Sequence, residues 1–167
     1  MDAVPAPTPA SARPAPIGRE AFPLFVEVQT RWADNDVYGH VNNVVYYSYF
    51  DTAVNRYLIE QGVLDIHAGS TIGLVVETQC HYFAPIAFPE PIEAGLRVAH
   101  VGRSSVRYEI GLFCRGHTHS AAHGRFVHVY VDRQTRRPVA LAPSFLQVLT
   151  GLQGHSANGP LDSASRS

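Results

Sequence analysis

RWADNDVYGHVNN, residues 31–43, lies where a predicted strand gives way to a predicted helix. The segment gathers aspartates, a histidine, a glycine and asparagines in a single connection. Because the first N–H groups of a helix lack backbone acceptors, a helix start can hold developing negative charge. A carboxylate beside such donors favours acyl-transfer chemistry.

The composition is that of one globular domain. The chain has 167 residues, of which 46% are hydrophobic, and a formal net charge of -1. Charge this close to neutral gives no reason to expect a nucleic acid or an anionic membrane as a partner. No apolar run reaches the ~18 residues that span a bilayer, and no secretory signal pattern stands at the N-terminus. We therefore expect a cytoplasmic protein in which Cys80 and Cys114 are reduced, buried thiols.

Three regions are expected along the chain. Residues 1–21 are rich in proline and alanine, which predicts a disordered arm. Residues 22–152 are expected to form the folded domain. Residues 153–167 are small and polar, which predicts a flexible tail.

The hydrophobic pattern predicts an α+β fold. Residues 24–32 alternate between two sets of side chains, which indicates a strand, and helical spacing over 43–61 predicts one long, deeply buried helix that Gly62 ends. One helix followed by antiparallel strands predicts a sheet wrapped around that helix, with dimerisation covering what remains exposed. The further strands are expected at 71–83, 91–101, 104–114 and 124–132, with 139–142 as a candidate extension and a short helix at 144–152 after Pro143.

Asp36 is the candidate catalytic residue. A carboxylate can attack a thioester carbonyl or deprotonate a water, and a thiolate leaving group needs little help from a general acid. The competing interpretation is structural, because an aspartate in a turn before a glycine often accepts hydrogen bonds from nearby backbone N–H groups. Gly39 suits a positive φ or a close backbone approach.

The neighbours of Asp36 have candidate roles of their own. His40 either donates a hydrogen bond to the thioester oxygen or braces the loop. Asn42 and Asn43 suit a helix N-cap, and the backbone N–H at or near Asn43 would serve as an oxyanion donor. Asp34 is expected to bind a loop amide or an arginine.

No metal or cofactor is expected. His117, His119 and His123 form the only close group of histidines, and their spacing matches no zinc signature. They are expected at a hairpin tip. The sequence holds neither a phosphate-binding glycine loop nor a G-x-S-x-G elbow, which argues against a serine hydrolase of the α/β type.

Residues 34–43, together with Tyr46, Tyr49 and Phe50, resemble the hot-dog-fold acyl-CoA thioesterases of the 4-hydroxybenzoyl-CoA thioesterase type. The pattern of that family runs D-x-D-x-x-G-H-V-N-N-x-x-Y-x-x-Y-F-E, and the element order agrees over roughly 24–150. The resemblance implies a hot-dog fold, a catalytic carboxylate at Asp36 and an oxyanion donor near Asn43.

A second segment also resembles this family. Arg103, Ser104 and Ser105 follow Gly102 in a strand connection of the kind that lies near coenzyme A (CoA) in such enzymes. Arg103 either contacts a phosphate as a charged donor or lies in solvent at a hairpin turn.

The chain departs from the family pattern at two positions. Asn35 stands where threonine or cysteine is common, and Asp51 stands where glutamate is common. The second change shortens the side chain by one methylene. Asp51 either orients water or binding groups, pairs with Arg56 or a partner subunit, or lies on a solvated helix face.

The sequence thus predicts an acyl-CoA thioesterase that releases a free acid and CoA. A homodimer or tetramer is expected, in which a neighbouring subunit completes an acyl tunnel. Two alternatives stay open: a non-catalytic acyl-CoA-binding module, and an acyl-carrier-protein thioesterase that docks its partner on Arg133, Arg136 and Arg137. Aromatic residues that either line the acyl pocket or belong to the core are Tyr46, Tyr47, Tyr49, Tyr57 and Phe83.

Overall fold

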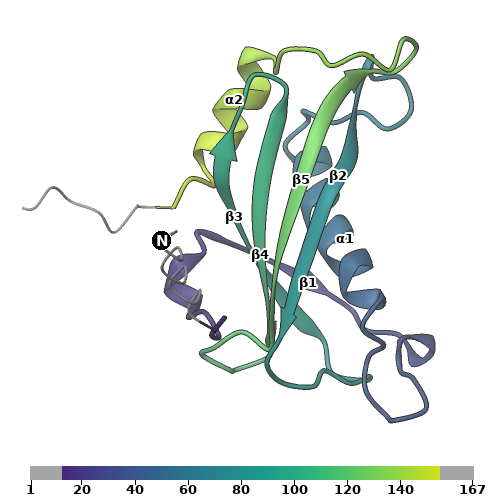
Figure 1. Ribbon diagram of the computed structural model, residues 1–167, viewed down its shortest axis with the longest axis vertical. Coiled ribbons are helices and arrows are strands. Elements are labelled where there is room, and N and C mark those ends of the chain that lie inside the picture. Colours follow the sequence, from purple (N-terminus) through teal and green to yellow (C-terminus); the bar gives the residue numbers. More distant parts are fainter. Residues whose placement is uncertain (1–12, 155–167) are drawn as a thin grey trace, which may run out of the picture.

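A five-stranded antiparallel sheet carries one long helix along one face (Figure 1). The computed structural model describes residues 13–154. Helix α1 (Val45–Glu60) lies between β1 and β2 in the chain, and the short helix α2 (Pro143–Thr150) follows β5. The predicted α+β class and the sheet around one helix are confirmed. The strands lie in the order β1-β3-β4-β5-β2, with bounds β1 Leu24–Val28, β2 Thr71–Tyr82, β3 Ile92–Val101, β4 Ser105–Cys114 and β5 Ala122–Asp132.

Helix α1 buries a wide stripe of side chains against the sheet. Its large and apolar residues recur every three or four positions, so they share one face. At Gly124 on β5 an added Cβ would lie 2.2 Å from the Phe50 ring, so the helix can lie this close to the strand only because Gly124 has no side chain. Gly62, with φ of +69°, follows the helix end, as predicted. The buried helix residues are Tyr46, Tyr49, Phe50, Ala53, Val54, Tyr57 and Leu58.

The first strand is shorter than the alternation indicated. Strand β1 ends at Val28, and Trp32 is 80% exposed in a 3-10 turn (Trp32–Asp34). The physical cause is the Asp34 carboxylate, which accepts the Arg31 N–H and closes a turn. Trp32 packs edge-on against Phe88 instead of entering the core.

The N-terminal segment lies on the sheet face opposite α1. Residues 17–21, part of the arm expected to be disordered, are instead held by hydrogen bonds: the Ile17 N–H donates to Ser120 Oγ at 3.0 Å, and the Ser120 N–H donates to the Ile17 carbonyl at 2.9 Å. Phe22 then lies over Gly95 and Gly111, where an added Cβ would come within 2.8 Å of its ring. Residues 1–12 and 155–167, which make up most of the expected arm and tail, lie outside the described residues.

Cys80 and Cys114 are free thiols, as expected, but only Cys114 is buried, whereas Cys80 is half-buried. The expected extension at 139–142 is reduced to a single bridge between Val131 and Pro138, because the chain then turns toward α2. Within residues 13–154, no helix combines the length and the apolar character needed to cross a bilayer.

His128 is a buried polar residue that the sequence pattern did not single out. It lies on β5 and is 2% exposed, among the rings of Tyr108, Phe126 and Tyr130. Neither ring nitrogen has a hydrogen-bond partner in the described part of the chain. Burial lowers the pKa of His128 to about 4, so the ring is neutral at pH 7 in the fold.

We expect His128 to make the protein sensitive to mild acid. A histidine in the unfolded chain has a pKa near 6.5, so between about pH 6.5 and pH 4 the unfolded chain binds more protons than the fold. The free energy of unfolding therefore falls across this window, by ~3 kcal/mol at most. In His128→Phe, the free energy of unfolding measured with urea should fall less between about pH 7 and about pH 4.5 than it does in the wild type. His117→Phe, an exposed position, should match the wild type, and an equal loss in all three proteins would contradict the prediction.

Candidate active site

Asp34 anchors the loop that holds the candidate catalytic residues. Its side chain is 1% exposed, and its carboxylate accepts hydrogen bonds from the Arg31 N–H (2.8 Å), from Arg31 Nε (2.9 Å) and from the Tyr49 hydroxyl on α1 (2.7 Å). Burial acts to raise the pKa of Asp34, but the hydrogen bonds from Arg31 and Tyr49 outweigh it and hold this pKa below its usual value. The expected binding of Asp34 to a loop amide or an arginine is confirmed.

The segment after Asp34 closes on itself. The Asp36 N–H donates to the His40 carbonyl at 2.8 Å, and the Gly39 N–H donates to the Asp36 carbonyl at 3.1 Å. Gly39 has a φ of +83°, a conformation that other residues rarely adopt, so the predicted positive φ is confirmed. The turn thus presents its side chains from a fixed backbone.

This closed turn is also tied to a distant part of the chain. The Val41 N–H donates to the Ile86 carbonyl at 2.7 Å, and Asn35 Oδ1 accepts the Phe88 N–H at 3.0 Å. Asn35, where the family commonly has threonine or cysteine, therefore holds the segment that follows β2.

Asp36 is both anchored and accessible. Its Oδ1 accepts the Tyr38 N–H at 2.8 Å, which is the turn contact that the structural interpretation expected. Its Oδ2 has no hydrogen-bond partner among residues 13–154. The side chain is half-buried, and its neighbours Val37 and Tyr38 are 94% and 81% exposed. One carboxylate oxygen is therefore available for chemistry.

The start of α1 supplies a free donor close by in the chain. The expected capping by Asn42 or Asn43 was wrong: the N-cap of α1 is Val44, which has no side-chain cap, and Asn42 Oδ1 instead accepts the N–H of Val44 at 3.1 Å. The Asn43 carbonyl accepts the Tyr82 hydroxyl at 3.1 Å, whereas the Asn43 N–H has no partner in the described part of the chain. A free N–H at the positive end of a helix is the type of donor that an oxyanion requires.

His40 and Tyr46 each match one of the two alternatives that the sequence left open. His40 contributes its carbonyl to the closed turn, and its side chain is exposed. Tyr46 is 3% exposed and packs edge-on against Tyr82, with ring centroids 4.9 Å apart. Burial raises the pKa of Tyr46 to about 12. In the single chain, Tyr46 is therefore a core residue and not part of an open binding surface.

Asp51 lies on the exposed face of α1. Its Oδ1 accepts a hydrogen bond from Asn55 Nδ2 at 2.9 Å. Arg56, one of the partners expected from the sequence, forms an ion pair with Glu60 at 2.8 Å instead, so that pairing was wrong. The exposed carboxylate of Asp51 is left facing solvent or another subunit.

Arg103, Ser104 and Ser105 lie at the opposite end of the sheet from the Asp36 loop. Arg103 and Ser104 lie in the turn between β3 and β4, and Ser105 begins β4, at the end where α2 lies (Figure 1). Ser105 pairs with Val129 near the end of β5, whereas the Asp36 loop adjoins the other end of the sheet. The predicted grouping of these residues with Asp36 around one ligand does not occur within one chain.

Part of the basic cluster considered for protein docking makes hydrogen bonds within the chain. Arg133 Nε donates to the Gly69 carbonyl at 2.7 Å, and Arg133 also donates to the Ile66 carbonyl at 3.1 Å. Arg133 therefore holds the loop before β2, and only Arg136 and Arg137 remain as exposed cations of this cluster.

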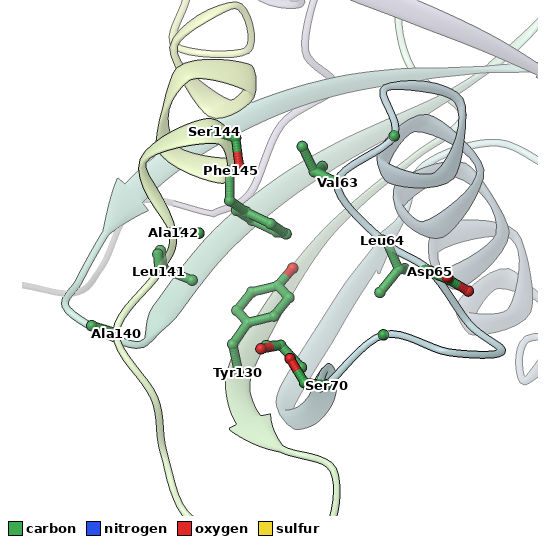
Figure 2. Close-up of a pocket in the computed structure, with 13 residues that line it drawn as sticks. Val63, Leu64, Asp65, Ser70, Tyr130, Ala140, Leu141, Ala142, Ser144 and Phe145 are labelled. Carbon is green, nitrogen blue, oxygen red and sulfur yellow. The ribbon is translucent and has the colours of Figure 1, made fainter.

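Figure 2 shows a pocket of about 230 Å³ beside α2. Leu141, one of its lining residues, donates its N–H to the Arg103 carbonyl at 3.0 Å, so the pocket lies at the same end of the sheet as Arg103. Its walls come from the segment after α1, from the start of β2 and from the segment leading into α2. Tyr130 lies below these walls, and its hydroxyl is 2.8 Å from the hydroxyl of Tyr108. The apolar side chains that line the pocket include Val63, Leu64, Leu141 and Phe145.

The three closely spaced histidines lie in or next to the hairpin connection between β4 and β5, as expected. His117 and His119 lie in the connection between β4 and β5, and His123 lies near the start of β5. Among residues 13–154, no three or more side chains of His, Cys, Asp or Glu are arranged to hold a metal ion.

Comparison with known proteins gives the family. Residues 30–149 match the thioesterase-like superfamily, so the chain belongs to that superfamily, and its sheet around one helix is the hot-dog fold. The chain is 55% identical to the PA5185 protein of Pseudomonas aeruginosa, with a TM-score of 0.83 over 85% of this chain and 99% of that one.

Two further proteins are similar. A thioesterase from Thermus thermophilus, complexed with coenzyme A and Zn, is 32% identical, with a TM-score of 0.67 over 82% of this chain and 99% of that one. The protein YsmA of Bacillus subtilis is 26% identical over 88 residues. That match spans 53% of this chain and 59% of YsmA.

Tyr49→Phe tests whether Asp34 anchors the loop. Removing the hydroxyl leaves a buried carboxylate short of one donor, so unfolding should become easier by ~1–3 kcal/mol at neutral pH. Tyr57→Phe is the matched control, because the Tyr57 hydroxyl donates to the uncharged Val148 carbonyl at 3.2 Å. The decrease in the free energy of unfolding should be smaller in Tyr57→Phe, about 1 kcal/mol or less.

The pH dependence gives the same test a second measurement. Because the pKa of Asp34 is lowered in the fold, its contribution to stability is complete above the unfolded value, about 4, and is lost as the pH falls through the folded value. The stability gap between wild type and Tyr49→Phe should therefore narrow at low pH. A gap that is constant with pH, or no larger than that of Tyr57→Phe, would show that Asp34 is not the anchor.

Proposed function

We propose that this protein hydrolyses acyl-CoA thioesters to a free acid and CoA, with Asp36 as the catalytic carboxylate. The observation that carries the proposal is the pair of unused groups on one anchored loop, Asp36 Oδ2 and the Asn43 N–H. Membership in the thioesterase-like superfamily supports thioester hydrolysis.

Two routes use the same groups. In one, Asp36 takes a proton from water, the water oxygen bonds to the thioester carbon, and the carbonyl oxygen becomes an oxyanion that accepts the Asn43 N–H. The carbon–sulfur bond then breaks and CoA leaves as a thiolate. In the other, Asp36 Oδ2 bonds to the carbon, CoA leaves, and water hydrolyses the resulting anhydride. In both routes the carbonyl re-forms as the sulfur departs.

Coenzyme A is the thiol carrier that we propose. The Thermus thermophilus thioesterase, 32% identical to this chain, is complexed with coenzyme A. Arg103, Ser104 and Ser105 offer a charged fork and two hydroxyls for its phosphates, but they lie far from Asp36 of their own chain. We therefore propose that they serve the site of a second subunit.

We propose a homodimer in which β2 pairs with β2 of the second copy. Strand β2 is 12 residues long and forms one edge of the sheet. Val75 and Val76 are 45% and 60% exposed along it. A long apolar edge readily pairs with another strand, and two-fold symmetry makes the pairing antiparallel. The Thr71 end of one β2 then lies beside the Tyr82 end of the other, where Asn43 is held.

Asp36→Asn tests the catalytic proposal. The amide keeps the Oδ1 contact to the Tyr38 N–H but is neither a base nor a nucleophile, so kcat on a good acyl-CoA should fall about 10²-fold or more. Asp132→Asn is the matched control, because Asp132 Oδ1 also accepts turn N–H groups, from Gln134 and Thr135, at the end of β5. Thiol release should be unchanged in that variant. Full activity in Asp36→Asn would remove Asp36 from the reaction.

Val76→Lys tests the dimer. A lysine on each copy would put two charges next to the two-fold axis and interrupt the apolar edge of β2, so the variant should sediment as a monomer while keeping its fold. Leu146→Lys, at a 40% exposed position on α2, should leave the assembly unchanged. Because Arg103 would no longer reach the partner's site, Val76→Lys should also lose acyl-CoA turnover. An intact dimer with the lysine at this position would rule out the proposed edge.

A further inference from the structure

We propose that Asn35 is a positioning residue for Asp36, and that its side-chain hydrogen bond to Phe88 sets the direction of the Asp36 carboxylate. This inference rests on the proposed function, because it concerns the residue next to the proposed base or nucleophile. Asn35 acts through the backbone that it shares with Asp36 and has no contact with the reacting atoms.

The backbone on both sides of Asn35 is paired with the segment that leads into α1. The Asp36 N–H donates to the His40 carbonyl, and the Asn42 N–H donates to the Asp34 carbonyl, each at 2.8 Å. These bonds hold the two arms of the loop together. Bonds inside a loop do not by themselves fix its direction relative to the rest of the fold, so contacts that leave the loop decide where Asp36 points.

Asn35 makes such a contact. Its Oδ1 accepts the Phe88 N–H at 3.0 Å, across 53 positions of the sequence. Because Asn35 has an extended backbone, with φ of -73° and ψ of 140°, its side chain and that of Asp36 leave the chain on opposite sides. Holding Asn35 against Phe88 therefore turns Asp36 to the side away from Phe88.

The asparagine side chain suits this bond in length and in chemistry. Phe88 is half-buried, and a buried N–H is costly without an acceptor in the protein. The amide oxygen of asparagine accepts hydrogen bonds and lies one bond farther from Cα than the hydroxyl of threonine. Asn35, which replaces the threonine or cysteine common in the family, therefore reaches a donor that those shorter side chains reach less well.

Trp32 contacts the same phenylalanine from the other side of Asp34. Its ring lies edge-on to the ring of Phe88, with centroids 6.1 Å apart. The loop thus holds Phe88 both by its N–H and by its ring. Trp32 is the only tryptophan of the chain, so its fluorescence reports on this contact without a competing signal.

Asn35→Leu tests the positioning role, because leucine has nearly the shape of asparagine but no acceptor. We expect kcat on a good acyl-CoA to fall about tenfold or more, since a small displacement of a catalytic group slows the chemical step. KM should change by less than about twofold, because the bond contributes nothing to substrate binding. Asn35→Ala removes the acceptor without adding bulk and replaces Asn35→Leu if that variant fails to fold.

Thr30→Val is the matched control. The buried Thr30 hydroxyl donates to the Glu90 carbonyl at 2.8 Å, so this variant also removes a hydrogen bond to the segment between β2 and β3, but it leaves the bond from Asn35 to Phe88 intact. Thr30→Val should lose stability as Asn35→Leu does and keep the wild-type kcat. An equal fall of kcat in both variants would show that Asn35 is only structural.

Asn35→Asp is the conservative variant. It keeps an oxygen that accepts the Phe88 N–H, so it should recover most of the wild-type kcat at about pH 8, where an aspartate is ionised. A kcat as low as that of Asn35→Leu would contradict the proposal.

Fluorescence separates this inference from the proposed function. Asn35→Leu should increase the local mobility of Trp32 and lower its fluorescence anisotropy, whereas Thr30→Val should leave the anisotropy unchanged. This measurement needs no turnover, so an unchanged anisotropy in Asn35→Leu overturns the inference even if the wild type hydrolyses no acyl-CoA. If the wild type is active and Asp36→Asn is not, but Asn35→Leu keeps the wild-type kcat, the proposed function stands and Asn35 does not position Asp36.

Discussion

The buried carboxylate of Asp34 joins the three parts of the molecule that the site needs. It closes the turn after β1 through Arg31, it holds helix α1 through Tyr49, and the Asp34 carbonyl accepts the Asn42 N–H at 2.8 Å. A charge inside a fold is stable only when several donors surround it, so this position allows few arrangements of the chain around it. The orientation of Asp36 and the free N–H of Asn43 both follow from this constraint.

Strand β2 connects two distant parts of the chain. Its last residue, Tyr82, donates a hydrogen bond to the Asn43 carbonyl just before α1, and its first residue, Thr71, lines the pocket beside α2. Within one chain these are opposite ends of the sheet. In the proposed dimer, pairing of the two β2 strands would bring these two ends together from different copies. The same sheet edge would then both form the dimer and complete the site.

The sequence predicted the parts of this protein that depend on local spacing. The stripe of Phe50, Val54 and Leu58 has the period of a helix, and the motif around Asp36 specified the closed turn through Gly39. Trp32 was placed wrongly, because alternation continued past the point where a side-chain hydrogen bond ended the strand.

Other features depend on contacts that spacing does not encode. Arg103 follows a recognisable motif, but its distance from Asp36 is set by the length of the strands. The pocket combines segments around Leu64, Tyr130 and Phe145, which lie far apart in the chain and have no common pattern. The burial of His128 could be suspected only from its alternation with Phe126 and Tyr130 on β5.

The N-terminal segment over the outer face has a practical consequence for this family member. Phe22 covers Gly95 and Gly111 and packs edge-on against Phe25 and Phe113. A shortened chain that began at β1 would expose Phe25 and Phe113 to water, together with the sheet surface at Gly95 and Gly111. An exposed hydrophobic patch of this kind promotes stacking of the sheets of separate molecules. Recombinant forms shortened at the N-terminus should therefore precipitate more readily than the whole chain.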